Sequence, residues 1–87
     1  MSGSDDHVAV TTDAVWPAEA DAEEAVVINW FAREGTSVQT GETICEIQVE
    51  KVDVDVLAPV EGTLAEIVCG EDDEFVRGDT LAWIAPD

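Results

Sequence analysis

The sequence has little positive charge. Three Lys and Arg residues stand against 21 Asp and Glu residues, which gives a formal net charge of -18 over 87 residues. A surface this negative repels phosphates, so the composition argues against nucleic acid and against anionic membranes as partners. The N-terminal residues also lack the basic region and apolar stretch of a secretory signal, and no apolar run is long enough to span a membrane. We therefore expect a cytoplasmic protein with no nucleic-acid or membrane partner.

The chain also lacks the length for two domains and the motifs of a catalytic or metal site. A domain of this size has little room for a deep cleft. The two cysteines, Cys45 and Cys69, each lie in an apolar run and are not at metal-ligand spacing, so we expect buried free thiols. His7 has no Ser, Cys or second His as a partner, and the acidic run 71–74 lacks the spaced ligands of a calcium loop. We expect no catalytic residue and no metal site.

The residues that are present favour a folded chain in spite of the charge. Disorder goes with few β-branched and aromatic residues, whereas this sequence is 46% hydrophobic and rich in Val, Ile and Trp. Self-repulsion weakens such a fold in dilute buffer, but at molar salt the Debye length falls to about 3 Å and the repulsion is screened. The composition therefore predicts a salt-loving source organism.

Short apolar runs separated by glycine-containing turns follow one another from Val26 onward, which predicts an all-β domain. Residues 1–7 are expected to be a disordered tail, and residues 8–87 to form the domain. A Val-Ala-Val strand signal lies within residues 7–12. The alanine-rich stretch 17–25 offers little to bury, so it favours a loop, with one turn of helix as the alternative.

An internal repeat relates two parts of the chain. The pattern of residues 38–47 recurs 37 residues later, in residues 75–84, with a shared glycine, an acid after it, a threonine and two aliphatic positions. The repeat suggests a barrel made of two similar halves. Chance is the alternative, because Gly-acid-Thr is common in hairpin turns.

The segment Ile44–Leu57 predicts a β-hairpin whose turn is Glu50-Lys51. With that turn, every cross-strand pair matches in polarity: Val49 with Val52, Gln48 with Asp53, Ile47 with Val54, Glu46 with Asp55, and Cys45 with Val56. One face of the hairpin is then apolar and the other polar, as a strand pair that covers a core requires. Moving the turn by one residue breaks this match, so the register is well specified.

The only lysine of the chain, Lys51, falls at the tip of this hairpin. A primary amine can lose a proton and form a stable amide, which arginine cannot do. The alternative is that Lys51 relieves repulsion among the acidic residues around it. Spacing and composition leave both interpretations open.

Three motifs resemble the lipoyl domains of 2-oxoacid dehydrogenase complexes: the Gly41-Glu42 turn, the Glu50-Lys51 tip and the closing segment Ala58–Gly62. The resemblance extends roughly from Val8 to Ile84 and is poorest before Val26. It implies a flattened barrel of two four-stranded antiparallel sheets with internal pseudo-two-fold symmetry.

The resemblance also implies a function. Lipoic acid would be bound covalently as N6-lipoyllysine at Lys51, with Glu50, Val49 and Val52 as the recognition residues around it. The chain would be a carrier and not an enzyme, with the cofactor as a swinging arm for acyl transfer. The implied partners are a lipoate ligase or lipoyl transferase and the 2-oxoacid decarboxylase, acyltransferase and dihydrolipoamide dehydrogenase components.

Two alternatives to this interpretation stay open. Biotinyl carrier domains have a similar fold and also use a hairpin lysine, but their tip reads Met-Lys-Met where this chain has Glu50-Lys51-Val52. The barrel could also act unmodified, as an interaction module.

Overall fold

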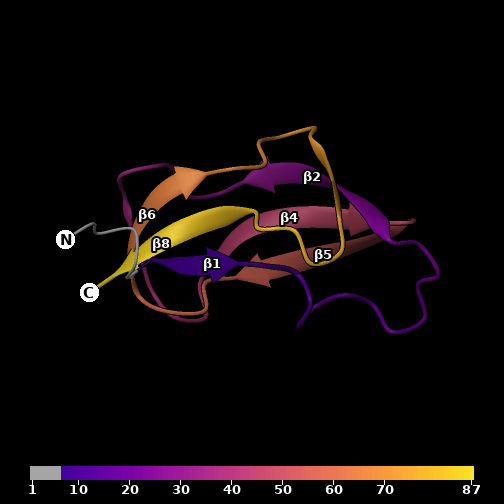
Figure 1. Ribbon diagram of the computed structural model, residues 1–87, viewed down its shortest axis with the longest axis horizontal. Coiled ribbons are helices and arrows are strands. Elements are labelled where there is room, and N and C mark those ends of the chain that lie inside the picture. The colour runs from indigo at the N-terminus through magenta and orange to yellow at the C-terminus, as the bar shows by residue number, and fades with distance from the viewer. Residues whose placement is uncertain (1–6) are drawn as a thin grey trace.

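The computed structural model describes residues 7–87 of the protein, which form eight β-strands (Figure 1). The all-β prediction is confirmed, and since no helix forms in this part of the chain, none is available there to cross a membrane. The strands are β1 (Val8–Val10), β2 (Glu24–Trp30), β3 (Ser37–Val38), β4 (Thr43–Val49), β5 (Val52–Leu57), β6 (Gly62–Ile67), β7 (Glu74–Val76) and β8 (Ala82–Pro86).

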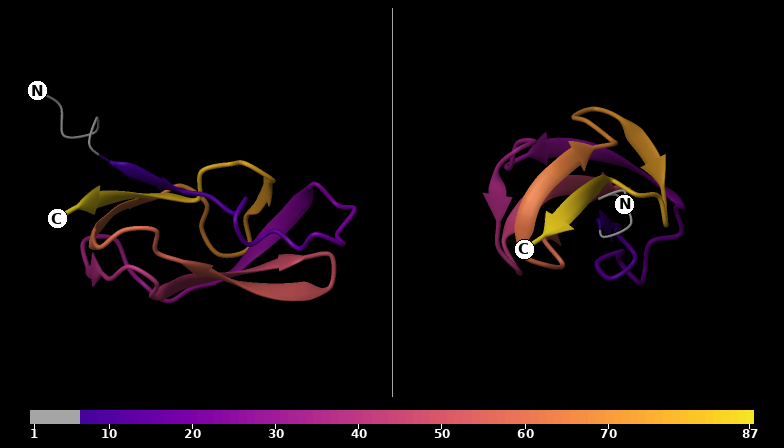
Figure 2. Two further views of the ribbon diagram at one scale, coloured as in Figure 1. Left: turned by 90° about the horizontal axis from the view of Figure 1, so that it is seen from below. Right: turned by 60° about the vertical axis from the view of Figure 1, so that its left-hand side comes forward.

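The strands build two four-stranded antiparallel sheets with orders β1-β8-β6-β3 and β5-β4-β2-β7. Replacing each strand of the second order by the strand four places away in the chain gives the first order, so the two sheets have one topology. The sheets curve around each other to form the barrel (Figure 2). The predicted flattened barrel with pseudo-two-fold symmetry is therefore confirmed.

The internal repeat is also confirmed, because its two turns have the same geometry. Gly41 and Gly78 have φ values of 85° and 95°, a left-handed conformation that glycine adopts without a steric penalty. In each turn the following acid, Glu42 or Asp79, donates its N–H to the carbonyl three residues earlier, at 2.9 and 3.0 Å. Its carboxylate accepts the N–H of that same earlier residue, again at 2.9 and 3.0 Å. Glycine and acid therefore act as one turn-forming unit in both halves.

Between the sheets lies a core of aliphatic side chains to which both halves contribute. Inward and outward residues alternate along most of the strands, as the period of two requires. β4 departs from this at a register shift, where Ile44 and Cys45 are both buried. The largest fully buried hydrophobic side chains are Val10, Val27, Val38, Ile44, Ile47, Val49, Val56, Leu64, Leu81 and Ile84.

The N-terminal third differs from expectation in detail. The stretch 17–25 is a loop up to residue 23, with one hydrogen-bonded turn at its start and no helix, so the loop prediction holds there. β2 begins at Glu24, two residues before the apolar runs that start at Val26, because Glu24 and Ala25 pair with β7. The expected tail, residues 1–7, lies outside the described residues except for His7, which directly precedes β1.

The cysteine prediction is half right. Both thiols are free, but only Cys45 is buried, whereas Cys69 is half-buried. Burial raises the pKa of the Cys45 thiol to about 12, with a further contribution from the nearby Cys69. The pKa of Cys69 is also raised, first by desolvation and then by the carboxylates of Asp79 and Asp73. Neither thiol is activated for chemistry at neutral pH.

Candidate functional site

The β4–β5 hairpin has the register that polarity matching predicts. All five cross-strand pairs between residues 45–49 and 52–56 form as expected, and Glu50 and Lys51 make the two-residue turn. Lys51 is exposed at this tip, at the end of the molecule opposite Asp87 (Figure 1). The structure thus presents the only lysine of the chain on a short and well-defined support.

The turn imposes a steric cost on Glu50. Of the two tip residues only Glu50 has a positive φ, 58°, the pattern of a type II′ turn. Glycine is usual at that position, and a side chain there costs of the order of 1 kcal/mol. Other contacts of Glu50 must offset this strain.

The Glu50 carboxylate holds a distant part of the chain. Its Oε2 accepts hydrogen bonds from the backbone N–H groups of Asp21 and Ala22, at 3.1 and 3.0 Å. Both donors lie in the segment 11–23 between β1 and β2, which we call the acidic loop. Sequence reasoning missed this contact, since backbone donors more than 25 positions away carry no residue signature.

The acidic loop is anchored on its other side by Trp16, which is buried. The Trp16 indole donates to the carbonyl of Ala22 at 3.3 Å and packs edge-on against Phe75, with ring centroids 6.3 Å apart. The Arg77 guanidinium lies 5.9 Å from the Trp16 ring centroid and 3.7 Å from the Asp13 carboxylate. Ala22 therefore links the tip to the barrel. Its N–H binds Glu50 at the tip, and its carbonyl binds Trp16, which packs against Phe75 on β7.

Next to the tip, the apolar face of the hairpin is covered on one strand only. Val49 on β4 is completely buried, but its partner Val52 on β5 is 49% exposed. β5 is an edge strand, so the sheet does not continue beyond it. Of the two valines that flank the tip, Val52 is therefore available for direct contact with another protein, and Val49 acts by fixing the hairpin.

Charge around the tip does not immobilise the lysine. Within residues 7–87 the structure holds one ion pair, between Arg77 and Asp13, and Lys51 does not take part in it. The neighbouring Asp53 instead accepts a hydrogen bond from Gln48, at 3.2 Å. This geometry gives little support to a purely charge-relieving role for Lys51.

The chemistry that this site offers is the attachment of a group to an amine. In the described part of the chain no three His, Cys, Asp or Glu side chains are placed to hold a metal. The Lys51 ammonium is at the end of a flexible side chain and, once deprotonated, is a nucleophile that can form an amide.

Comparison with known proteins defines the family. Residues 14–84 match the biotin/lipoyl family, described as "Biotin-requiring enzyme". A solved structure, the lipoyl domain of the 2-oxoglutarate dehydrogenase complex from Azotobacter vinelandii, superposes with a TM-score of 0.67 at 29% identity, over 90% of this chain and 92% of that one. The chain belongs to the biotin/lipoyl family, and its fold is that of a lipoyl domain.

Curated relatives are larger proteins. Over 61 residues, or 70% of this chain, it is 34% identical to the dihydrolipoyllysine-residue acetyltransferase component of the pyruvate dehydrogenase complex of Corynebacterium glutamicum. Over the same length it is 36% identical to the succinyltransferase component of the 2-oxoglutarate dehydrogenase complex of Rickettsia conorii and 39% identical to the acetyltransferase component of Mycobacterium bovis. The match spans only 9%, 15% and 11% of these relatives.

Proposed function

We propose that this chain is a lipoyl carrier domain in which an amide joins lipoic acid to the Nζ of Lys51. The observation that carries the proposal is the placement of the only lysine at the exposed tip of a two-residue hairpin turn. The relatives, which are dihydrolipoyllysine-residue acyltransferase components, support it. When attached, lipoic acid supplies a dithiolane that can carry acyl groups and reducing equivalents between active sites.

The chain's own residues would present the lysine and would not react themselves. The paired strands β4 and β5 fix the position of the tip, and the Glu50 carboxylate holds the tip against the acidic loop. A modifying enzyme would then find the amine at a defined place and direction. Glu50 and Val52, which are both exposed, would be the side chains that contact that enzyme.

The proposed partners follow from the carrier role. A lipoate ligase or lipoyl transferase would modify Lys51, and the 2-oxoacid decarboxylase, acyltransferase and dihydrolipoamide dehydrogenase components would act on the attached group. We place this system in the cytoplasm of a salt-adapted cell, on the basis of the net charge of -18.

Mass spectrometry tests the proposal. The protein purified from its native cell, or coexpressed with a lipoate ligase in medium containing lipoate, should gain the mass of one lipoyl group, located on Lys51 by peptide mapping. Lys51→Arg is the matched control, because it keeps the positive charge but cannot form the amide. It should remain folded and unmodified.

Other outcomes would contradict the proposal in distinct ways. A mass gain that corresponds to biotin would identify a biotinyl carrier, the other class of the family. A bare Lys51 in native protein at every stage of growth would favour an unmodified interaction module.

A further inference from the structure

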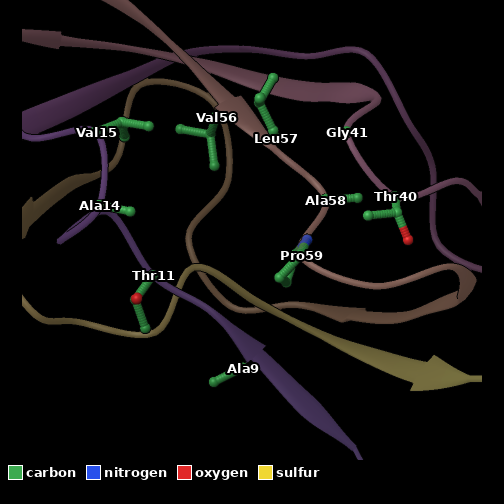
Figure 3. A pocket seen from close by; sticks show the side chains of 10 residues that line it. All are labelled: Ala9, Thr11, Ala14, Val15, Thr40, Gly41, Val56, Leu57, Ala58 and Pro59. Atoms are coloured by element: carbon green, nitrogen blue, oxygen red, sulfur yellow. The ribbon is translucent and has the colours of Figure 1, made fainter.

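A cavity of about 380 Å³ lies along the seam where the two sheets meet at their edge strands β1 and β5 (Figure 3). One wall comes from β1 and the acidic loop, including Ala9 and Val15, and the rest of the lining comes from residues 40–41 and 56–59. We call it the seam cavity. Its size is within the range of small-molecule sites, about 300–1,000 Å³.

The lining of the seam cavity is uncharged. None of its ten residues is charged, although 28% of the chain is. The side chains of Val15 and Val56 point toward each other across it (Figure 3). A neutral and apolar group therefore suits this cavity, whereas the acidic surface around it would repel anions.

A row of valines connects the hairpin tip to the seam cavity. Val52, Val54 and Val56 alternate along β5, and all three lie opposite the inward-facing residues of β4. Val52 is 49% exposed, Val54 is half-buried, and Val56 is buried in the cavity wall. The row therefore offers an apolar path that starts beside Lys51.

The length of a lipoyl-lysine matches this path. Twelve bonds separate the lysine Cα from the nearer ring sulfur, which corresponds to about 14 Å at about 1.2 Å per bond in an extended chain. Val56 is five residues from Lys51 along β5, or about 17 Å at about 3.3 Å per residue. The ring would thus reach the near side of the cavity, and the methylene chain would lie over Val52 and Val54.

We propose that the seam cavity binds the dithiolane end of the lipoyl group carried by Lys51, folded back along the valine row of β5. This inference rests on the proposed function, because it requires lipoylation at Lys51. The site gives the arm a resting position on its own domain, in which the apolar chain and ring are shielded from water. A partner's active site then competes with the seam cavity for the arm.

Nuclear magnetic resonance on methyl-labelled, lipoylated protein tests the inference. Intact mass first establishes that Lys51 is lipoylated, so a failure of the proposed function is detected before the spectra are recorded. We expect nuclear Overhauser contacts from the lipoyl ring protons to the methyl groups of Val15 and Val56, together with methyl shift changes relative to unmodified protein. Contacts and shifts confined to Val52, beside the tip, in fully lipoylated protein would overturn the inference alone.

A pair of variants distinguishes the seam cavity from non-specific contact. Ala14→Glu introduces a carboxylate at an exposed position of the cavity wall, and Ala65→Glu introduces the same charge at an exposed position on β6. We expect the ring contacts to Val56 to weaken several-fold in lipoylated Ala14→Glu and to persist in lipoylated Ala65→Glu. Equal contacts in the two variants would show that the arm does not occupy the cavity.

Discussion

The contact between Glu50 and the acidic loop can be tested by replacing Glu50 with alanine. The change removes both hydrogen bonds to the N–H groups of Asp21 and Ala22 but leaves the cross-strand pairs of the hairpin in place. A hydrogen bond contributes about 0.5–1.5 kcal/mol net, and the lower part of that range applies to an exposed carboxylate. The pair is therefore worth about 1.4 kcal/mol, which corresponds to a tenfold change in the opening equilibrium of the loop.

Hydrogen exchange measures this effect directly. In Glu50→Ala the amides of Asp21 and Ala22 should exchange about tenfold faster, while amides in the centre of β4 should change much less, because the loop opens locally. Glu50→Gln keeps a neutral acceptor of similar shape. Its Asp21 and Ala22 amides should therefore exchange at a rate between those of the parent and of Glu50→Ala. The ligase should also modify Glu50→Ala with a raised KM, since the tip is held less firmly.

The control for Glu50→Ala must remove the same charge elsewhere. Glu66→Ala does this at an exposed position on β6 and should leave the loop amides unchanged. If Asp21 and Ala22 exchange at the parental rate in Glu50→Ala, the carboxylate does not hold the loop. The positioning role that we assign to Glu50 would then be wrong.

Three further predictions concern stability. The unfolding temperature should rise as KCl is increased from 0.15 to 1 M, where the Debye length falls from about 8 to about 3 Å; calorimetry that shows equal stability at both concentrations would remove the support for salt adaptation. Stability should be unaffected by Cys45 below pH 9 and should fall between pH 9 and about 12, because only the unfolded state ionises this thiol there; Cys45→Ala should flatten that part of the pH profile. Gly62→Ala should lower the free energy of unfolding by about 1–3 kcal/mol, because its Cβ would overlap the carbonyl of Ala85 on β8. In Gly70→Ala the Cβ would meet nothing closer than 3.7 Å, so thermal melts should show a smaller loss of stability.

The sequence predicts the hairpin well because local rules agree there. Five polarity-matched pairs allow one register, and that register places the lysine at the tip. It predicts burial less well. Polarity alone gives β5 the same apolar face as β4, but only the order of strands in the sheet shows that β5 is an edge and that Val52 is half exposed.

The acidic loop is the part that sequence reasoning describes least. The sequence predicts only a loop with little to bury over residues 17–25, yet Trp16 is buried against Phe75 and the loop backbone binds Glu50. Both contacts join residues far apart in the chain, and one of them uses backbone donors, which every residue type supplies. Trp30 also makes a contact that its sequence context does not indicate, because its indole donates to the backbone carbonyl of the distant Cys69 at 2.7 Å.

In the structure, the repeat extends beyond residues 38–47 and 75–84, where the sequence shows it. The 37-residue offset relates Gly35 to Asp72, which both have positive φ, 89° and 71°. Their N–H groups donate to Leu64 and Val27, also 37 residues apart, at 2.7 and 2.8 Å. Aspartate tolerates the left-handed region better than most residues, so the backbone repeats while the residue type changes.

The proposed function depends on a place where this symmetry is broken. The antiparallel pairs β4–β5 and β8–β1 are equivalent, but only β4 and β5 are joined by a turn, and that turn carries Lys51. In the equivalent pair, the end of β8 and the start of β1 lie next to each other and are not joined by a turn. β1 therefore begins, and β8 ends, at the end of the domain opposite the tip (Figure 1). A tether attached there would not compete with a partner's active site for access to the lysine, which is the arrangement that a mobile carrier requires.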